Sequence, residues 1–362
     1  PRHTEGAHAI DERDEARSRE IGRAFEIATP FISVLIALLI GSLVIALSGG
    51  SPVAAFAAMF KGAFGSQRQI GETLLRATPL IFTGLAVAYG FRAGLFNIGA
   101  EGQLFMGGLA AAFLGVQLGS LPAPVAVPLI LAGAMLAGAG WAFVPALMKA
   151  RIGAHEVITT MMFTYIARYT VSWLVTGPLK APGSVPQTTM IAVSSRLPRL
   201  SELFGFLQPS RAHLGIVVAV IAAVVTWLLL RYTTVGYEAR AVGFNPLASE
   251  AGGISIAATT VKSLCISGAL AALAGASEVM GVHYLLFDQF SSGFGFTGIA
   301  VALLAKTNPL GVIPAALLFG AMSAGAGTMQ LEAHVSQKVI ALIQGLIVFL
   351  VGAQLIVTWV IA

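Results

Sequence analysis

Long runs of apolar residues recur along almost the whole chain, and they constrain its fold more than any other feature. A helix needs roughly 20 apolar residues to cross a bilayer, because the hydrocarbon core is about 30 Å thick. Nine runs approach or exceed that length and one is shorter: 29–48, 72–89, 98–118, 124–148, 157–176, 214–230, 256–279, the short 296–305, 310–329 and 339–361. We therefore expect an all-α membrane protein with about ten transmembrane helices over residues 29–362, preceded by a polar tail at residues 1–28.

The composition supports a membrane environment and excludes other classes of protein. Hydrophobic residues make up 57% of the chain and charged residues 10%, whereas a soluble domain carries roughly 25% charged residues. The spans use most of the length, so no soluble catalytic domain fits in the remainder. The net charge of +5 suits basic residues that orient membrane helices, and we expect no nucleic-acid partner.

Basic residues between the runs predict the orientation of the chain. With the N-terminus inside, the cytoplasmic side gains the basic tail and the residues Arg92, Lys149, Arg151, Arg231, Arg240 and Lys306. Both termini are then cytoplasmic. Residues 177–212 form a long periplasmic loop, and residues 233–255 form a long cytoplasmic loop. The tail lacks the short apolar core of a secretory signal, which also favours a cytoplasmic position.

Two glycine-rich segments stand at the start of the third and eighth runs. Residues 94–103 place Asn97, Glu101 and Gln103 among glycines, and residues 293–300 contain Phe294, Phe296 and Thr297. Because the two runs cross in opposite directions, interrupted helices at matching places indicate a transport pathway between inverted repeats, with spans 2–5 paired with spans 7–10. Close packing of helices through small residues explains the glycines equally well.

Other chemical motifs are few. Arg168 is the deepest ionisable side chain, and residues 284–296 combine five aromatic rings with polar groups that suit either a ring-shaped ligand or an interfacial belt. No G-x-x-x-x-G-K-[ST] sequence is present, so ATP must be bound by a partner. His155-Glu156 lacks a second histidine four residues on, and Cys265 is the only cysteine, so we expect no metal site.

The cytoplasmic loop contains a local helix signal. Asn245 is a typical N-cap, Pro246 suits the first helical position and Gly253 is a stop, so residues 245–253 predict one short helix. Such a helix can dock in a groove of a soluble ATPase, or it can be a simple connector.

Three segments together resemble one family. Residues 94–103, residues 293–304 with Asn308-Pro-Leu-Gly311, and residues 243–254 are similar to permeases of ABC importers in the branched-chain amino acid, ribose and nucleoside group. The likeness is greatest to the simple-sugar and nucleoside branch, and it runs from about Glu72 to the last helix. The long tail and the long outer loop resemble the larger of the two unlike permeases found in that branch.

The resemblance implies a type II importer permease in a bacterial cytoplasmic (inner) membrane, forming half of a dimeric pathway with a second, homologous permease. Its partners would be a cytoplasmic ABC ATPase that binds ATP and Mg²⁺, a periplasmic or lipid-anchored binding protein, and membrane lipid. The chain would bind no cofactor and would not be an enzyme. The ATPase contact would comprise Gly243, Asn245, Pro246, Ala248, Glu250 and Gly252, and the pathway would comprise Asn97, Glu101, Gln103, Phe294, Phe296 and Thr297.

The substrate and the energy source leave alternatives open. The resemblance suggests nucleosides, but permeases for simple sugars such as ribose or galactose share nearly the same motifs. An ion-coupled secondary transporter would use intramembrane acids such as Glu101 and Glu278 and would need no partner. A membrane-embedded enzyme has no support, because no catalytic motif occurs at membrane depth.

Overall fold

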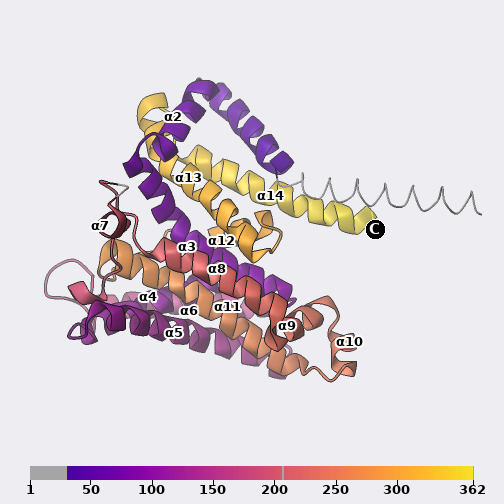
Figure 1. Ribbon diagram of the computed structural model, residues 1–362. Coiled ribbons are helices and arrows are strands. Elements are labelled where there is room, and N and C mark those ends of the chain that lie inside the picture. Colours follow the sequence, from indigo (N-terminus) through magenta and orange to yellow (C-terminus); the bar gives the residue numbers. More distant parts are fainter. Residues whose placement is uncertain (1–30, 206–207, 362) are drawn as a thin grey trace, which may run out of the picture.

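A computed structural model describes residues 31–205 and 208–361, and nearly all of these residues are helical (Figure 1). The expected tail at residues 1–28 lies outside the described residues. The described part contains no β-strand, only two isolated bridges between residues 187 and 287 and between residues 199 and 213. The larger helices after the one at Phe31–Leu47 are α2 (Pro52–Phe64), α3 (Gln67–Arg92), α4 (Ala100–Gln117), α5 (Ala123–Ile152), α6 (Glu156–Thr176), α8 (Gly215–Tyr232), α9 (Thr234–Phe244), α11 (Ile256–Glu278), α12 (Phe294–Leu304), α13 (Pro309–Ala333) and α14 (Lys338–Ile361).

Five described helices are long and apolar enough to cross a membrane. They are α3, α5, α8, α13 and the continuous helix Ile256–His283, which joins α11 to the π-helical turn η2 (Val279–His283). The helix Phe31–Leu47 and α2 meet at a bend of 120° and would together make a sixth span. The all-α membrane fold is therefore confirmed, with five or six candidate spans, while the expected count of about ten stays a prediction.

Helix ends differ from the apolar runs by several residues. The second run was expected at 72–89, whereas α3 extends from Gln67 to Arg92. The Ser66 side chain accepts a hydrogen bond from the Gln69 amide and caps the helix ahead of its first charged residues. Apolar runs therefore locate helices but do not set their ends, because polar turns at the interface remain helical.

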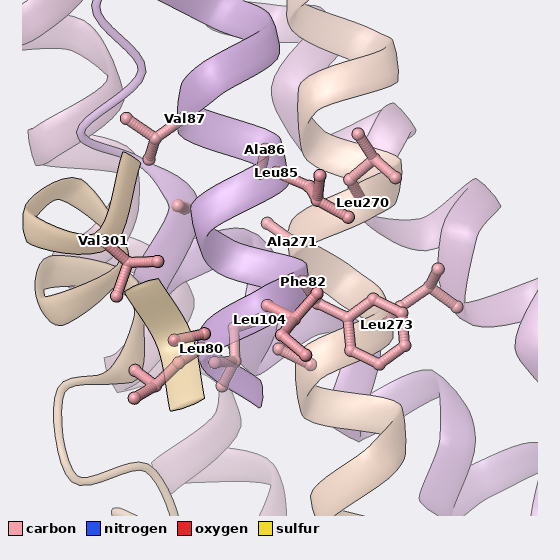
Figure 2. Packing of buried hydrophobic residues seen from close by; sticks show 14 of the residues in the cluster. Leu80, Phe82, Leu85, Ala86, Val87, Leu104, Leu270, Ala271, Leu273 and Val301 are labelled. Carbon is pink, nitrogen blue, oxygen red and sulfur yellow. The ribbon is translucent and has the colours of Figure 1, made fainter. Parts of the chain in front are cut away.

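Helix α3 forms the centre of the protein. It packs against α11, α12, α13 and α8, and most of its length is buried in the protein. Figure 2 shows Leu80, Phe82 and Leu85 of α3 in one cluster with Leu270 of α11 and Val301 of α12. The rest of the bundle is arranged around α3, with α4, α5, α6 and α11 in one group (Figure 1).

Helices α5 and α11 approach each other closely through small residues. A methyl group added to Gly268 would overlap the backbone of Gly138, and one added to Gly138 would overlap the backbone of Gly268. Helices within a membrane gain little from the hydrophobic effect, so such close backbone contact is a main source of association. Gly138 and Gly268 therefore serve close packing between α5 and α11.

The long segment between α6 and α8 is fixed to the end of α11. It contains a 3₁₀ turn (η1, Val193–Ser195) and a short helix (α7, Leu200–Phe204). The amides of Ile191 and Leu197 donate to the carbonyl oxygens of Tyr284 and Met280, both at 2.9 Å. This segment is therefore attached to η2 and to the residue that follows it.

Candidate functional site

The two glycine-rich segments meet in space at the first turns of α4 and α12. Gly94 and Gly293 both have positive φ, at 69° and 87°. Gly94 follows the C-terminus of α3, and Gly293 is the N-cap of α12. The carboxyl Oε2 of Glu101 in α4 accepts the backbone N–H of Gly295 in α12 at 2.6 Å. A methyl group at Gly295 would overlap the backbone of Glu101, so only glycine allows this contact.

Glu101 lies between two helix N-termini. It occupies the first turn of α4 and caps an amide of the first turn of α12, and both helix N-termini carry partial positive charge. Its exposed fraction is 5%. A carboxyl group held this deeply in a membrane helix is a functional candidate.

A small polar cavity of about 150 Å³ opens beside Glu101. The guanidinium of Arg168 in α6 donates to Oε1 of Gln289 at 2.7 Å. The cavity thus offers a carboxyl, a guanidinium, an amide and hydroxyl groups together with aromatic rings. Its lining residues are Glu101, Phe105, Thr164, Tyr165, Arg168, Gln289, Ser291, Gly293 and Phe296. Such a set suits a neutral molecule with hydroxyl groups and a planar ring.

Only part of the predicted pathway set lines this cavity. Glu101 and Phe296 do so. Asn97 and Gln103 are each 1% exposed and exchange two hydrogen bonds, at 2.8 and 3.1 Å. Asn97 also donates to the Ser267 hydroxyl at 2.8 Å, so these amides form a closed network that connects α4 to α11.

The remaining two predicted residues lie in the first turn of α12. Phe294 packs against the hydrophobic core, and its carbonyl oxygen accepts the Thr83 hydroxyl at 3.0 Å. The Thr297 hydroxyl donates to the carbonyl oxygen of Gly293 at 3.2 Å. Neither lines the cavity, although both shape the helix end that does.

Five lining residues with polar side chains were absent from the predicted set, namely Thr164, Tyr165, Arg168, Gln289 and Ser291. Arg168 had a signal, because it is the deepest ionisable residue. Gln289 and Ser291 lie in the aromatic segment 284–296, which suited a ligand site. No sequence signal marked Thr164, because its position depends on how α6 packs against α4.

A wider apolar groove of about 820 Å³ follows the open face of α6. It is lined by Val157, Ile158, Met161, Met162, Tyr165, Ile166, Tyr169, Thr170 and Trp173. Tyr165 lines both this groove and the polar cavity, so the cavity lies directly beside the groove.

The short helix predicted over residues 245–253 is present as α10 (Pro246–Ala251). The Asn245 side chain accepts the Ala248 amide at 3.1 Å, and Gly252 ends the helix, one residue before the expected stop. A second helix, α9, precedes it and was not predicted; the Thr233 hydroxyl caps α9 by accepting the Gly236 amide. The exposed fractions of Phe244 and Leu247 are 96% and 77%.

The residues of the predicted ATPase contact lie together around α10. Gly243, the last but one residue of α9, is half-buried, whereas Asn245, Pro246, Ala248, Glu250 and Gly252 are exposed. Glu250 and Gly253 line a groove of about 510 Å³ between α10, the start of α11 and Lys149 at the end of α5.

Gly243 also connects this loop to the turn that precedes α4. A methyl group on Gly243 would overlap the carbonyl oxygen of Arg92, and one on Gly94 would lie 2.9 Å from Cα of Gly243. The turn at residues 92–94 leads through the Asn97 network to Glu101. The turn at residues 92–94 therefore lies between α9 and the segment that carries Asn97 and Glu101.

Comparison with known proteins places this architecture in a family. The profile of the family described as "Branched-chain amino acid transport system / permease component" matches residues 69–352. The Guanosine ABC transporter permease protein NupP of Bacillus subtilis is 39% identical over 335 residues, which cover 92% of this chain and 95% of NupP. From the same organism, the Guanosine ABC transporter permease protein NupQ is 27% identical over 256 residues, covering 69% of this chain and 79% of NupQ.

Two further relatives match over similar lengths. The Glucose ABC transporter permease protein TsgB13 of Haloferax volcanii is 36% identical over 90% of this chain and 87% of its own length. The Nucleoside ABC transporter permease protein NupB of Lactococcus lactis subsp. cremoris is 32% identical over 92% of each chain. No solved structure matches the chain.

Proposed function

This chain belongs to the family of branched-chain amino acid transport system permease components and is a multi-pass permease of an ABC importer, and from that premise we propose that it carries nucleosides across the membrane. As a permease it is a transport component and not an enzyme. The observation that carries the proposal is the cavity beside Glu101, which combines hydrogen-bonding side chains with Phe105, Tyr165 and Phe296. A nucleoside needs both, because its base stacks on rings and its ribose hydroxyls require hydrogen-bond partners.

The proposed topology has about ten spans over residues 29–362 with both termini in the cytoplasm, residues 1–28 being the cytoplasmic tail. Spans 2–5 (α3 to α6) and 7–10 (α11 to α14) form inverted repeats of a type II importer. The contact between the first turns of α4 and α12, each preceded by a glycine with positive φ, supports this pairing.

The pathway passes the Glu101 cavity, with Phe296 on its wall and Asn97, Gln103, Phe294 and Thr297 holding the two helix ends in place. The cavity of about 150 Å³ has room for roughly five water molecules, so one chain encloses only part of a nucleoside. A second permease subunit completes the pathway in this proposal. The apolar groove of α6 beside the cavity supports that position for the partner.

A heterodimer is the proposed assembly. Two different proteins of Bacillus subtilis are named guanosine ABC transporter permeases, and this chain is similar to both. As an ABC permease, the chain works with a cytoplasmic ATPase, which binds ATP and Mg²⁺, and with a binding protein, periplasmic or lipid-anchored, that delivers the substrate.

The loop 233–255 is the proposed contact with the ATPase, through Gly243, Asn245, Pro246, Ala248, Glu250 and Gly252, while the loop 177–212 faces the periplasm. ATP binding closes the ATPase dimer and displaces α10, and the contact of Gly243 with residues 92–94 transmits that displacement towards α4. Hydrolysis then resets the transporter.

The test is ATPase activity of the reconstituted complex, containing both permeases, the ATPase and the binding protein, in proteoliposomes. Guanosine and other nucleosides should stimulate hydrolysis and enter the vesicles, whereas ribose, galactose and glucose should not. If sugars stimulate hydrolysis and nucleosides do not, the substrate is a simple sugar, and the 36% identity to TsgB13 supports that alternative. Uptake by the chain alone, driven by an ion gradient without ATP, would instead establish a secondary transporter.

A further inference from the structure

Three arginines from three helices converge on a cavity at the opposite end of the bundle from the long segment between α6 and α8. The cavity, of about 220 Å³, is lined by Arg92, Trp227, Leu230, Arg231, Arg240, Asn308 and Pro309. Arg92 ends α3, Arg231 lies in the last turn of α8, and Arg240 lies on α9. We call this the arginine cavity.

Each guanidinium is held in place without a carboxylate. Arg92 Nε donates to the Thr307 carbonyl at 3.1 Å and Arg240 Nε to the Gly236 carbonyl at 3.4 Å, while Arg231 lies 5.8 Å from the centre of the Trp227 ring. Within residues 31–205 and 208–361, no ion pair involves any of the three. These contacts leave the terminal N–H groups of the guanidinium forks available for an anion.

The general excess of basic residues on the cytoplasmic side does not explain this arrangement. Orientation of the helices requires only that basic residues lie on one side of the membrane. These three arginines surround a single cavity despite their mutual repulsion. The N-terminus of α13, a helix of 25 residues capped by Asn308, adds partial positive charge at the same point.

An apolar groove adjoins the arginine cavity and shares Arg92 and Asn308 with it. The groove measures about 720 Å³, and its other lining residues include Phe31, Val34, Leu304, Pro314 and Leu318. A free phosphate would use only the arginines. A molecule with a phosphate head and a hydrocarbon tail would fill both spaces.

We propose that the arginine cavity and the adjoining groove together bind an anionic phospholipid, with the phosphate between Arg92, Arg231 and Arg240 and an acyl chain in the groove. Basic pockets between membrane helices on the cytoplasmic side recognise such head groups. The proposal relies on the proposed function only for the orientation that makes this the inner leaflet. The site lies beside α9, so a bound lipid would fix the helix that leads to α10.

The experiment measures lipid binding to the purified chain by native mass spectrometry in a mild detergent, with dioleoyl phosphatidylglycerol and dioleoyl phosphatidylcholine as probes. Wild type should retain phosphatidylglycerol preferentially, and the R92Q/R231Q/R240Q variant should bind it about tenfold more weakly, equivalent to about 1.4 kcal/mol. The control R68Q/R151Q/K180Q removes the same charge outside the cavity and should bind like wild type. Equal losses in both variants, or none in either, would overturn the proposal.

Two further arms test the occupant. Dihexanoyl phosphatidylglycerol should bind more weakly than the dioleoyl lipid, because its short chains leave the groove unfilled. Equal binding of the two lipids would overturn the lipid assignment in favour of a free phosphate compound. Inorganic phosphate should then bind at the same site. Loss of the ATPase from the complex in R92Q/R231Q/R240Q, with lipid binding retained, would reassign the arginines to the ATPase interface. Lipid binding needs no transport, so failure of nucleoside uptake leaves this result unaffected.

Discussion

Glu101 joins α4 to α12, because its carboxyl Oε2 accepts the Gly295 amide at 2.6 Å. Glutamine keeps the length of the side chain and an oxygen acceptor, but it removes the ionisable carboxyl group between two helix N-termini. If Glu101 serves the pathway, substrate-stimulated ATPase activity should fall by about tenfold in Glu101→Gln while the unfolding temperature in detergent changes little, since a comparable acceptor remains.

The matched control for this prediction is Glu332→Gln. Glu332 is exposed and pairs with Lys61 at 2.7 Å, so its replacement should leave both activity and stability unchanged. If Glu101→Gln retains full activity, the carboxylate is structural and the pathway assignment of Glu101 is wrong.

His213 predicts a pH dependence of stability. It lies just ahead of the α8 span, is 2% exposed, and accepts the Gly215 amide at Nδ1. Burial lowers the pKa of His213 to about 4, from an ordinary value of 6.5. Between these two values the unfolded chain holds more protons than the folded chain. The stability that comes from the neutral ring is therefore complete above pH 6.5 and is lost as the pH falls towards 4.

The expected loss approaches about 1.4 kcal/mol per pH unit in that window. The unfolding temperature of wild type should fall more between pH 7 and pH 5 than that of His213→Asn, which keeps an acceptor for Gly215 but does not titrate. His155→Asn, at an exposed position, should follow wild type. Parallel pH profiles for His213→Asn and wild type would show that another group causes any acid sensitivity.

Among the helices, α9 and α10 connect the exposed loop at residues 244–253 to the turn before α4. The contact at Gly243 leaves no space for a methyl group against the Arg92 carbonyl. Gly243→Ala should therefore displace α9 from that turn and destabilise the protein by about 1–3 kcal/mol. In the assembled complex it should lower the number of nucleosides transported per ATP hydrolysed, because the displacement of α10 no longer reaches α4.

Gly140→Ala is the control for this prediction, since nothing lies within 4 Å of the added carbon on α5. It should leave the transport ratio unchanged and should not lower the unfolding temperature, because alanine favours a helix interior more than glycine does. An unaltered ratio in Gly243→Ala, despite a loss of stability, would separate this contact from coupling and leave it a structural role.

Across the whole molecule, the sequence predicts the features that are determined by residues close together in the chain. The Asn245 cap, the proline at position 246 and the stop at Gly252 or Gly253 act within one turn, so α10 could be predicted from neighbouring residues. The Asn97 network depends on Ser267, 170 residues away, and the cavity depends on Arg168 meeting Gln289, 121 residues away. Those pairings follow from helix packing, which apolar runs alone do not specify.

The assembly itself can be tested at the face of α6. Tyr169 and Trp173 are 69% and 63% exposed along the apolar groove, and Leu136 on α5 is 73% exposed. In one chain all three could face lipid. If a second permease covers α6, Tyr169 and Trp173 face protein and Leu136 still faces lipid. The polar cavity beside Tyr165 then lies between the two subunits.

Cys265 is the only cysteine, so a Cys265→Ala background allows one labelled position at a time. Benzophenone maleimide attached to a cysteine introduced by Tyr169→Cys should crosslink to the second permease in the assembled complex, whereas the same label introduced by Leu136→Cys should yield no protein crosslink. Crosslinking from both positions would indicate contact at α5 as well. If the intact complex crosslinks only from the Leu136→Cys position, the second subunit lies against α5. The cavity beside Glu101 would then face lipid and could not line a shared pathway.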